Sequence, residues 1–83
     1  MNKYGDIKVF DTEPTLEEMQ SVVGGMVEAV YLENGDVLII NENGKLLELP
    51  LNEIATKIFH DNGGDILDGI VGDVAIVPKE FWK

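Results

Sequence analysis

Two segments of the chain carry apolar residues at helical spacing. The first begins at Thr15, whose side chain can accept from the backbone N–H of Glu18 while the Glu18 side chain reaches back, which is the capping-box pattern. Gly24-Gly25 predicts its end. The expected apolar stripe consists of Leu16, Met19, Val22 and Val23. A helix this short is marginal in water, so we expect tertiary packing to stabilise it.

The second helical segment follows Pro50-Leu51, with Asn52 as the expected N-cap and Asn62-Gly63-Gly64 as its end. Its expected buried side consists of Ile54, Ala55, Ile58 and Phe59. His60, the only histidine, lies in its last turn. A cation is favourable there against the helix dipole, so we interpret His60 as structural.

Between the helices, apolar runs are interrupted by Asn34-Gly35 and Asn43-Gly44, both typical of two-residue type I′ hairpin turns. The spacing predicts a three-stranded meander in which Tyr31 lies opposite Leu38 and Glu42 lies opposite Lys45. We expect both helices to pack on its core face. That face would consist of Val27, Ala29, Tyr31, Leu38, Ile40, Leu47 and Leu49.

The opposite face of this meander is too apolar for a solvated sheet face. It would carry Glu28, Val30, Leu32, Val37, Ile39, Asn41, Leu46 and Glu48. Another segment of the chain or a second subunit should therefore cover it, and we favour the chain itself because small domains need every contact.

Flanking segments complete a single small domain spanning residues 1–83, of the α+β class with a small antiparallel sheet and two short helices. Residues 7–10 read as a first strand and residues 71–77 as a last strand, followed by a short tail over residues 78–83. The aromatic pair Phe81-Trp82 in this tail either folds back on the core, which we favour, or forms an exposed contact site.

Charge restricts the partners of this domain. Sixteen acidic residues oppose six lysines, with no arginine, for a net charge of −10. Nucleic acid and anionic membranes should be repelled, whereas a basic protein face or metal cations are favoured; the alternative is that the charge only maintains solubility. The chain has no cysteine, no signal-peptide pattern and no apolar run near the roughly 20 residues of a membrane span. We expect a cytoplasmic protein.

No catalytic set or cofactor motif is evident, so we expect a protein that is not an enzyme. Ser21, the only serine, lies on a predicted helix without a nucleophile motif. The loop over residues 61–73 is rich in Asp and Gly, as calcium loops are, but Gly63 and Gly72 occupy positions that require ligands. Helix termination and turns explain these residues equally well, and we predict no metal site. A small-ligand or divalent-ion site in this loop stays an alternative, as does a homo-oligomeric structural role.

The order of helix, Gly-Gly and hairpin resembles one family. Its matching segments are Leu16–Val30, Asn41–Leu46, Leu49–Asn52 and Gly69–Val77. The chain from Ile7 to Val77 is similar to the domain of unknown function 3846 family, whose members occur in phages, plasmids and other mobile elements. The resemblance implies no catalytic residues. It implies a small accessory protein that acts by binding another protein. The acidic, arginine-free composition adds the hypothesis that this partner is a host nucleic-acid-binding or defence protein, which the chain would inhibit. A homodimer that uses the apolar second face of the sheet is another arrangement.

The residues that could contact such a partner are carboxylates along the predicted sheet and the aromatic pair of the tail. They are Glu28, Glu33, Asp36, Glu42, Glu48, Phe81 and Trp82. Mimicry of nucleic acid would require these carboxylates to be aligned, because DNA presents one charge per roughly 1.7 Å of its axis.

Overall fold

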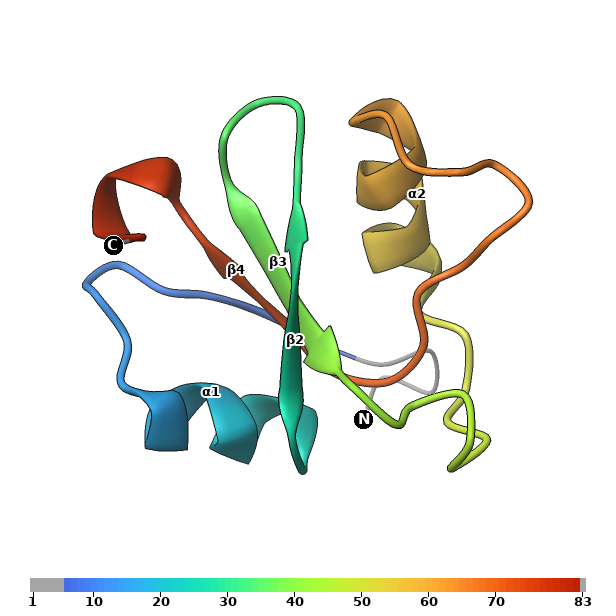
Figure 1. The fold of residues 1–83 in the computed structure, drawn as a ribbon, viewed down its shortest axis with the longest axis horizontal. Helices are drawn as coiled ribbons and strands as arrows, with labels where there is room; N and C mark the ends of the chain where they lie inside the picture. The colour runs from blue at the N-terminus through green and yellow to red at the C-terminus, as the bar shows by residue number, and fades with distance from the viewer. Residues whose placement is uncertain (1–5, 83) are drawn as a thin grey trace.

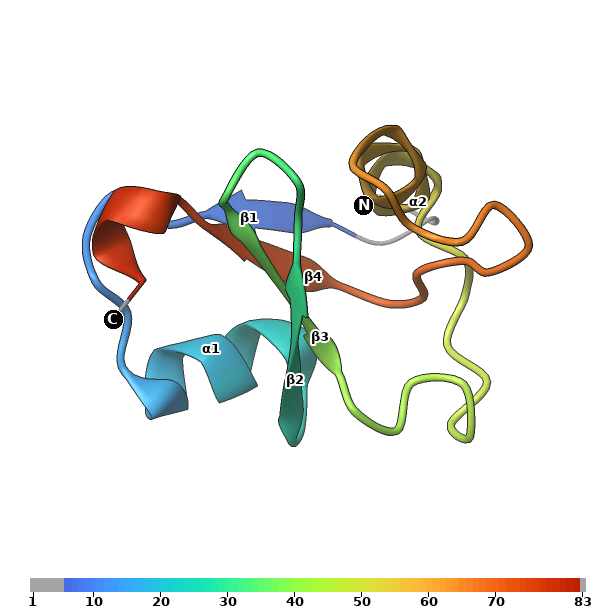
Figure 2. The ribbon, with the colours of Figure 1, turned by 45° about the horizontal axis from the view of Figure 1, so that its top comes forward.

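The computed structural model describes residues 6–82 and contains one four-stranded sheet with a helix on each face (Figures 1 and 2). The segment 1–5, where no signal peptide was expected, and Lys83 of the tail lie outside the described residues. The elements are β1 (Ile7–Val9), α1 (Leu16–Val23), β2 (Val27–Tyr31), β3 (Val37–Asn41), α2 (Glu53–Asp61), β4 (Val74–Val77) and the 3-10 helix η1 (Lys79–Phe81). The predicted α+β class is confirmed.

Both predicted helix starts are confirmed. The Thr15 hydroxyl accepts from the N–H of Glu18 (3.1 Å), and the Glu18 carboxylate accepts from the N–H of Thr15 (2.8 Å), completing the capping box of α1. The helix ends at Gly24, whose φ of 81° is costly for a residue with a side chain. In α2, the Asn52 side chain accepts from the N–H of Ala55 (3.0 Å).

The sheet order is β1-β4-β3-β2, with β1 parallel to β4 and the other two pairs antiparallel. Three antiparallel strands in chain order do form, but the third is β4. The expected strand around Lys45–Leu49 is instead a series of turns, in which Leu47 N–H donates to the Asn43 carbonyl (2.9 Å). The predicted Glu42–Lys45 pair was therefore wrong, and Lys45 pairs with Asp68.

The first hairpin lies where the sequence predicts it, but its loop contains three residues. Leu32 N–H donates to the Asp36 carbonyl (3.0 Å), and Gly35, with φ at 95°, donates to the Leu32 carbonyl (3.0 Å). This arrangement is a turn followed by a left-handed glycine, the common three-residue hairpin loop. Tyr31 consequently lies opposite Val37, one residue from the predicted partner, and every β2–β3 pair is shifted with it.

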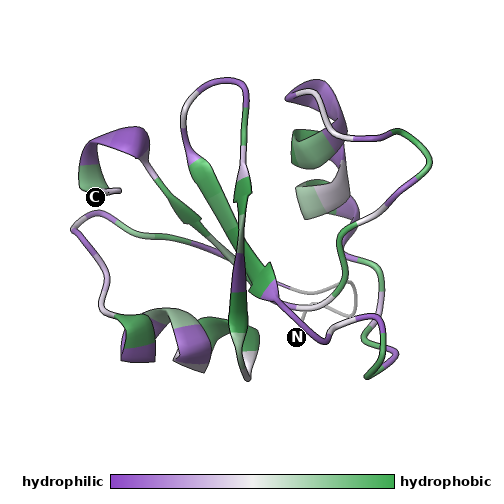
Figure 3. Cartoon of the chain, viewed as in Figure 1, coloured by the Kyte–Doolittle hydropathy of each residue, from purple (hydrophilic) through white to green (hydrophobic). Residues whose placement is uncertain are grey.

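A one-residue shift changes which side chains share a face. One face of the sheet packs against α1 through Val37, Ile39, Ala75 and Val77, and the other packs against α2 through Leu38 and Val74. The expectation that both helices share one face was wrong, whereas covering of the second face by the chain itself is confirmed (Figure 2). Apolar colour follows β3 and the sheet-facing sides of both helices in Figure 3.

Some expected core positions are exposed because of this arrangement. Tyr31 is 68% exposed, and Leu16 and Ile54 of the helical stripes are also exposed. The tail does fold back as favoured: Phe81 and Trp82 pack against the α1-side core, and the Trp82 ring meets the Tyr31 ring edge-on, with centroids 6.0 Å apart. The last strand is shorter than predicted, since Val71 makes an isolated bridge with Leu51.

Candidate functional site

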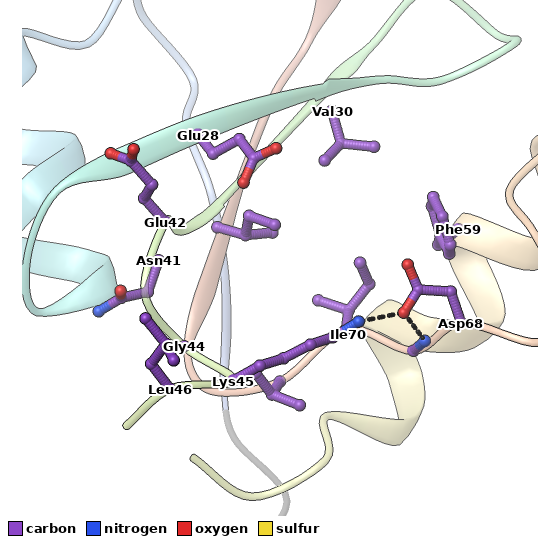
Figure 4. Close-up of a pocket in the computed structure, with 13 residues that line it drawn as sticks. Glu28, Val30, Asn41, Glu42, Gly44, Lys45, Leu46, Phe59, Asp68 and Ile70 are labelled. Atoms are coloured by element: carbon purple, nitrogen blue, oxygen red, sulfur yellow. Dashed lines mark hydrogen bonds and ion pairs between the residues drawn. The ribbon is translucent and has the colours of Figure 1, made fainter. Parts of the chain in front are cut away.

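A cavity with a volume of about 360 Å³ lies on the α2 side of the β2–β3 hairpin (Figure 4). The strands form one wall, and two loops, residues 42–49 and 64–71, form another. Its apolar surface comes from Val30, Ile40, Phe59 and Ile70. Its polar rim comes from Glu28, Glu42, Lys45 and Asp68. An apolar pocket with a few convergent polar groups is the usual form of a binding site.

The 64–71 loop is fixed to α2 by side chains of that helix. The Thr56 hydroxyl accepts from the N–H of Ile70 (2.9 Å) and donates to its carbonyl (3.2 Å), while His60 Nε2 donates to the Asp68 carbonyl (2.6 Å). This wall of the pocket is therefore anchored at two points, one of them a contact of His60 that the sequence did not predict.

The 42–49 loop is fixed by Asn41, which is buried at the end of β3. Its side-chain oxygen accepts from the N–H of Asn43 (2.8 Å), and its Nδ2 donates to the Val23 carbonyl (3.0 Å). Gly44 allows a close approach, because a Cβ there would lie 2.8 Å from Val71 Cγ2. The loop thus passes directly over the segment that leads into β4.

The two loops are joined by an ion pair between Lys45 and Asp68. The Asp68 carboxylate also accepts from the N–H of Gly69 (2.8 Å). The Lys45 hydrogen bond, followed by that of Gly69, holds the pKa of Asp68 below its ordinary value. Asp68 consequently neutralises the charge of Lys45 at the outer rim of the pocket.

Glu28 and Glu42 are the uncompensated charges of this pocket. Within residues 6–82, the ion pairs are Lys45–Asp68 and Lys57–Asp61, and neither involves Glu28 or Glu42. Both side chains are exposed, and Figure 4 shows them on the strand side of the pocket, across from Phe59 and Asp68. The pocket therefore combines an apolar floor with a negative rim.

The structure separates the other predicted contact residues from this pocket. Glu33 and Asp36 lie at the far end of the hairpin, where Asp36 accepts from the N–H of Lys79 (3.0 Å). Glu48 lies in the 42–49 loop with φ at 56°. Phe81 and Trp82 lie on the α1 side. The five sheet carboxylates therefore do not form one row, because the hairpin register and the missing third strand disperse them.

Sequence reasoning missed Lys45, Asp68 and Phe59 as pocket residues. Lys45 and Asp68 are 23 positions apart and meet only because two irregular loops lie against each other. Phe59 was assigned to the core of α2. The one available signal was the unusually apolar composition of the 42–49 and 64–71 loops, where Leu46 and Leu67 are 85% and 93% exposed.

Two further findings concern metals and membranes. Among the residues that the structure describes, no three His, Cys, Asp or Glu side chains are grouped so that they could hold a metal ion together. Across the same part of the chain, neither helix has the length and apolarity required to span a bilayer.

Comparisons with known proteins place the chain in one family. Residues 2–80 match the family described as domain of unknown function (DUF3846). No curated protein and no solved structure is significantly similar to the chain. The match extends over nearly the whole sequence, and the chain therefore belongs to the domain of unknown function 3846 family.

Proposed function

We propose that this protein is a non-enzymatic accessory protein that binds a basic segment of another protein at the pocket between the β2–β3 hairpin and the 42–49 and 64–71 loops. The observation that supports this proposal is the pair of uncompensated carboxylates, Glu28 and Glu42, above the apolar floor of Val30, Ile40 and Phe59. An enzyme would need a nucleophile, base or metal set in such a pocket, and the proposal requires none.

The chemistry of the pocket matches a Lys or Arg side chain. Such a side chain can lay its aliphatic stem along Val30 and Phe59 while its charged end meets Glu28 and Glu42. The net charge of −10 adds long-range attraction, which increases the association rate with basic partners and weakens as salt is added. The exposed Leu46 and Leu67 beside the pocket offer apolar contact area at its margin.

This partner chemistry is that of a nucleic-acid-binding protein, whose basic surface is free when no nucleic acid occupies it. Occupation of that surface by an acidic protein would block nucleic acid by competition. For an accessory protein of phages or mobile elements, we propose that the target is a basic host protein of this class. The pocket, and not an aligned row of carboxylates, would provide the contact.

A defined peptide tests the binding role. The probe is a fluorescent peptide of about nine residues that alternates Lys and Val, measured by anisotropy over a salt series, with a Glu-Val peptide as the negative control. We expect the double variant Glu28→Gln, Glu42→Gln to bind the Lys peptide on the order of three- to tenfold more weakly at low salt, as for two partly exposed charge pairs.

The matched control is Glu17→Gln, which removes a carboxylate of the same type from the exposed face of α1. Its affinity should stay within about twofold of the unmodified protein, since a distant exposed charge contributes little. No binding of the Lys peptide, or an equal loss in both variants, would contradict the proposed function.

A second candidate function uses the same pocket for a small ligand or divalent ion. Asp68 and Gly69 of the Asp/Gly-rich loop line it, and its volume of about 360 Å³ lies within the range of small-molecule sites. Thermal unfolding in the presence of nucleotides and divalent ions tests this alternative. A rise in melting temperature that Glu28→Gln abolishes would favour it, and an unchanged melting temperature would exclude it.

A further inference from the structure

β2 is an end strand of the sheet, and its outer edge is open. The sheet order places β3 on one side of β2, and within residues 6–82 no strand pairs with the other side. In Figure 1, β2 crosses in front of β3, so that its free edge faces the viewer. An open edge presents a row of unpaired backbone donors and acceptors to which another extended chain can bond.

The hydrogen-bond pattern identifies the residues that present these groups. Glu42 N–H donates to the Met26 carbonyl (2.8 Å), and Leu32 N–H donates to the Asp36 carbonyl (3.0 Å), so even-numbered residues of this strand bond toward β3. Because bonded and non-bonded pairs alternate in an antiparallel ladder, Val27, Ala29 and Tyr31 direct their backbone N–H and C=O groups outward.

β2 has few of the features that usually protect an edge. Proteins shield edge strands with charged side chains, especially lysine, and with proline, bulges or very short length. β2 is five residues long, has no lysine or proline, and carries one charged side chain, that of Glu28. The apolar side chains of Met26, which precedes the strand, and of Tyr31, at its end, are exposed. The other edge strand, β1, is three residues long and carries Lys8.

The open edge and the acidic pocket adjoin each other. Glu28 and Val30 line the pocket, while the alternate residues Val27, Ala29 and Tyr31 belong to the α1 side of the sheet. A strand added to β2 would place every second side chain beside Glu28 and Val30, and the remaining side chains near Tyr31, which contacts Trp82.

From this juxtaposition we infer that the partner binds by β-strand addition: an extended basic segment of another protein pairs with the outer edge of β2 and directs alternate Lys or Arg side chains toward Glu28 and Glu42. The inference rests on the proposed function and specifies its geometry. Backbone hydrogen bonds supply affinity in this mode, and the pocket for alternate side chains supplies specificity. Each added charge also reduces the excess of negative charge on the chain.

A second copy of the chain is a poorer occupant of this edge. Pairing of two β2 strands would bring together two chains that each carry a net charge of −10. Charge complementarity therefore favours a basic heterologous segment, and self-pairing becomes an outcome that the experiment distinguishes.

The test compares the Lys-Val peptide with the same peptide N-methylated at the alternate residues whose backbone N–H groups would bond to β2. Methylation removes the backbone donors and leaves the charges unchanged, so we expect binding to weaken by about tenfold or more. In the protein, Ala29→Pro removes one outward N–H without removing a bond to β3, and it should weaken binding similarly. Hydrogen exchange followed by NMR should show the amides of Val27, Ala29 and Tyr31 slowed by the unmethylated peptide.

These measurements separate the two proposals. If the methylated peptide binds equally well and the three amides stay unprotected, while Glu28→Gln, Glu42→Gln still weakens binding, strand addition is wrong and the proposed function stands. If no Lys peptide binds, both fail. The inference would also be overturned if, without peptide, the same amides were protected from exchange and this protection increased with protein concentration. A second copy of the chain would then occupy the edge. Should Ala29→Pro unfold the protein, the methylated peptide decides alone.

Discussion

Asn52 offers the sharpest test of how the fold is stabilised. Its side chain is 1% exposed and serves two segments of the chain at once. The side-chain oxygen accepts from the N–H of Ala55 (3.0 Å), which caps α2. Its Nδ2 donates to the buried carbonyl of Gly72 (2.9 Å) and to that of Asp6 (3.2 Å), and so connects the start of α2 to the segments preceding β4 and β1.

The replacement Asn52→Ala removes both contributions. Loss of an N-cap costs about 1 kcal/mol. Loss of the Nδ2 donor leaves the Gly72 carbonyl without this partner in a buried position, which costs about 1–3 kcal/mol, whereas the Asp6 carbonyl still accepts from the N–H of Val74 (2.9 Å). The expected total is about 2–4 kcal/mol. The whole domain is expected to be stable by on the order of 4–12 kcal/mol, at about 0.05–0.15 kcal/mol per residue.

Thr15→Ala is the matched control, because Thr15 caps α1 through a single exposed bond to Glu18 N–H. Its expected cost is about 1 kcal/mol. Urea unfolding followed by circular dichroism and by the fluorescence of Trp82 measures both variants. With an m-value of roughly 1 kcal/mol per M, the midpoint should fall by about 2–4 M for Asn52→Ala and about 1 M for Thr15→Ala. Equal shifts in the two variants would refute the reasoning that Asn52 acts as more than a cap.

Two further predictions concern the ion pair at the pocket and the hairpin. The pKa of Asp68 is lowered in the folded state, chiefly by the hydrogen bond from Lys45. The ionised Asp68 therefore stabilises the fold above its unfolded pKa of about 3.9, and this stabilisation disappears as pH falls through the lower folded pKa. Asp68→Asn should destabilise the protein at neutral pH, and acid denaturation curves of the variant and the unmodified protein should converge toward about pH 2. Deletion of Glu33 should leave a two-residue Asn-Gly loop and keep Ala29 opposite Ile39. A cross-strand Hα–Hα NOE between Ala29 and Ile39 would show the unchanged register, whereas an NOE between Ala29 and Leu38 would contradict this prediction.

Local signals in the sequence predicted the helices well. The start of each helix depends on an N-cap side chain and on residues within three positions of it, as at Thr15 for α1 and Asn52 for α2. These determinants are visible in a short window of sequence. Folding back of the Phe81-Trp82 tail and covering of the second sheet face followed from the need of a small chain to bury its apolar residues.

The strand register could not be predicted in the same way. Val37, Leu38 and Ile39 are all at most 1% exposed, because β3 is central and both faces are covered. Alternation of polar and apolar residues, which normally fixes the register, is therefore absent from this strand. The Asn34-Gly35 pair was left as the sole guide, and it is compatible with two-residue and three-residue loops. The prediction of a third strand after Asn43-Gly44 was wrong for a related reason. This pair does form a turn, but the turn belongs to the 42–49 loop and no strand follows it there.

The candidate site arises where this two-sided covering is incomplete. α2 covers Leu38 and Val74 on its face of the sheet, but beside Glu28 and Val30 of β2 a cavity remains between the strands, Phe59 of α2 and the 42–49 and 64–71 loops. The same strand ends the sheet, so its side chains border a pocket while its backbone has an unpaired edge. A buried strand such as β3 could offer neither feature. Sequence alone identified Glu28 and Glu42 as candidates from their charge, but only the register and the sheet order show that these two carboxylates share one pocket beside a free strand edge, whereas Glu33 and Asp36 do not.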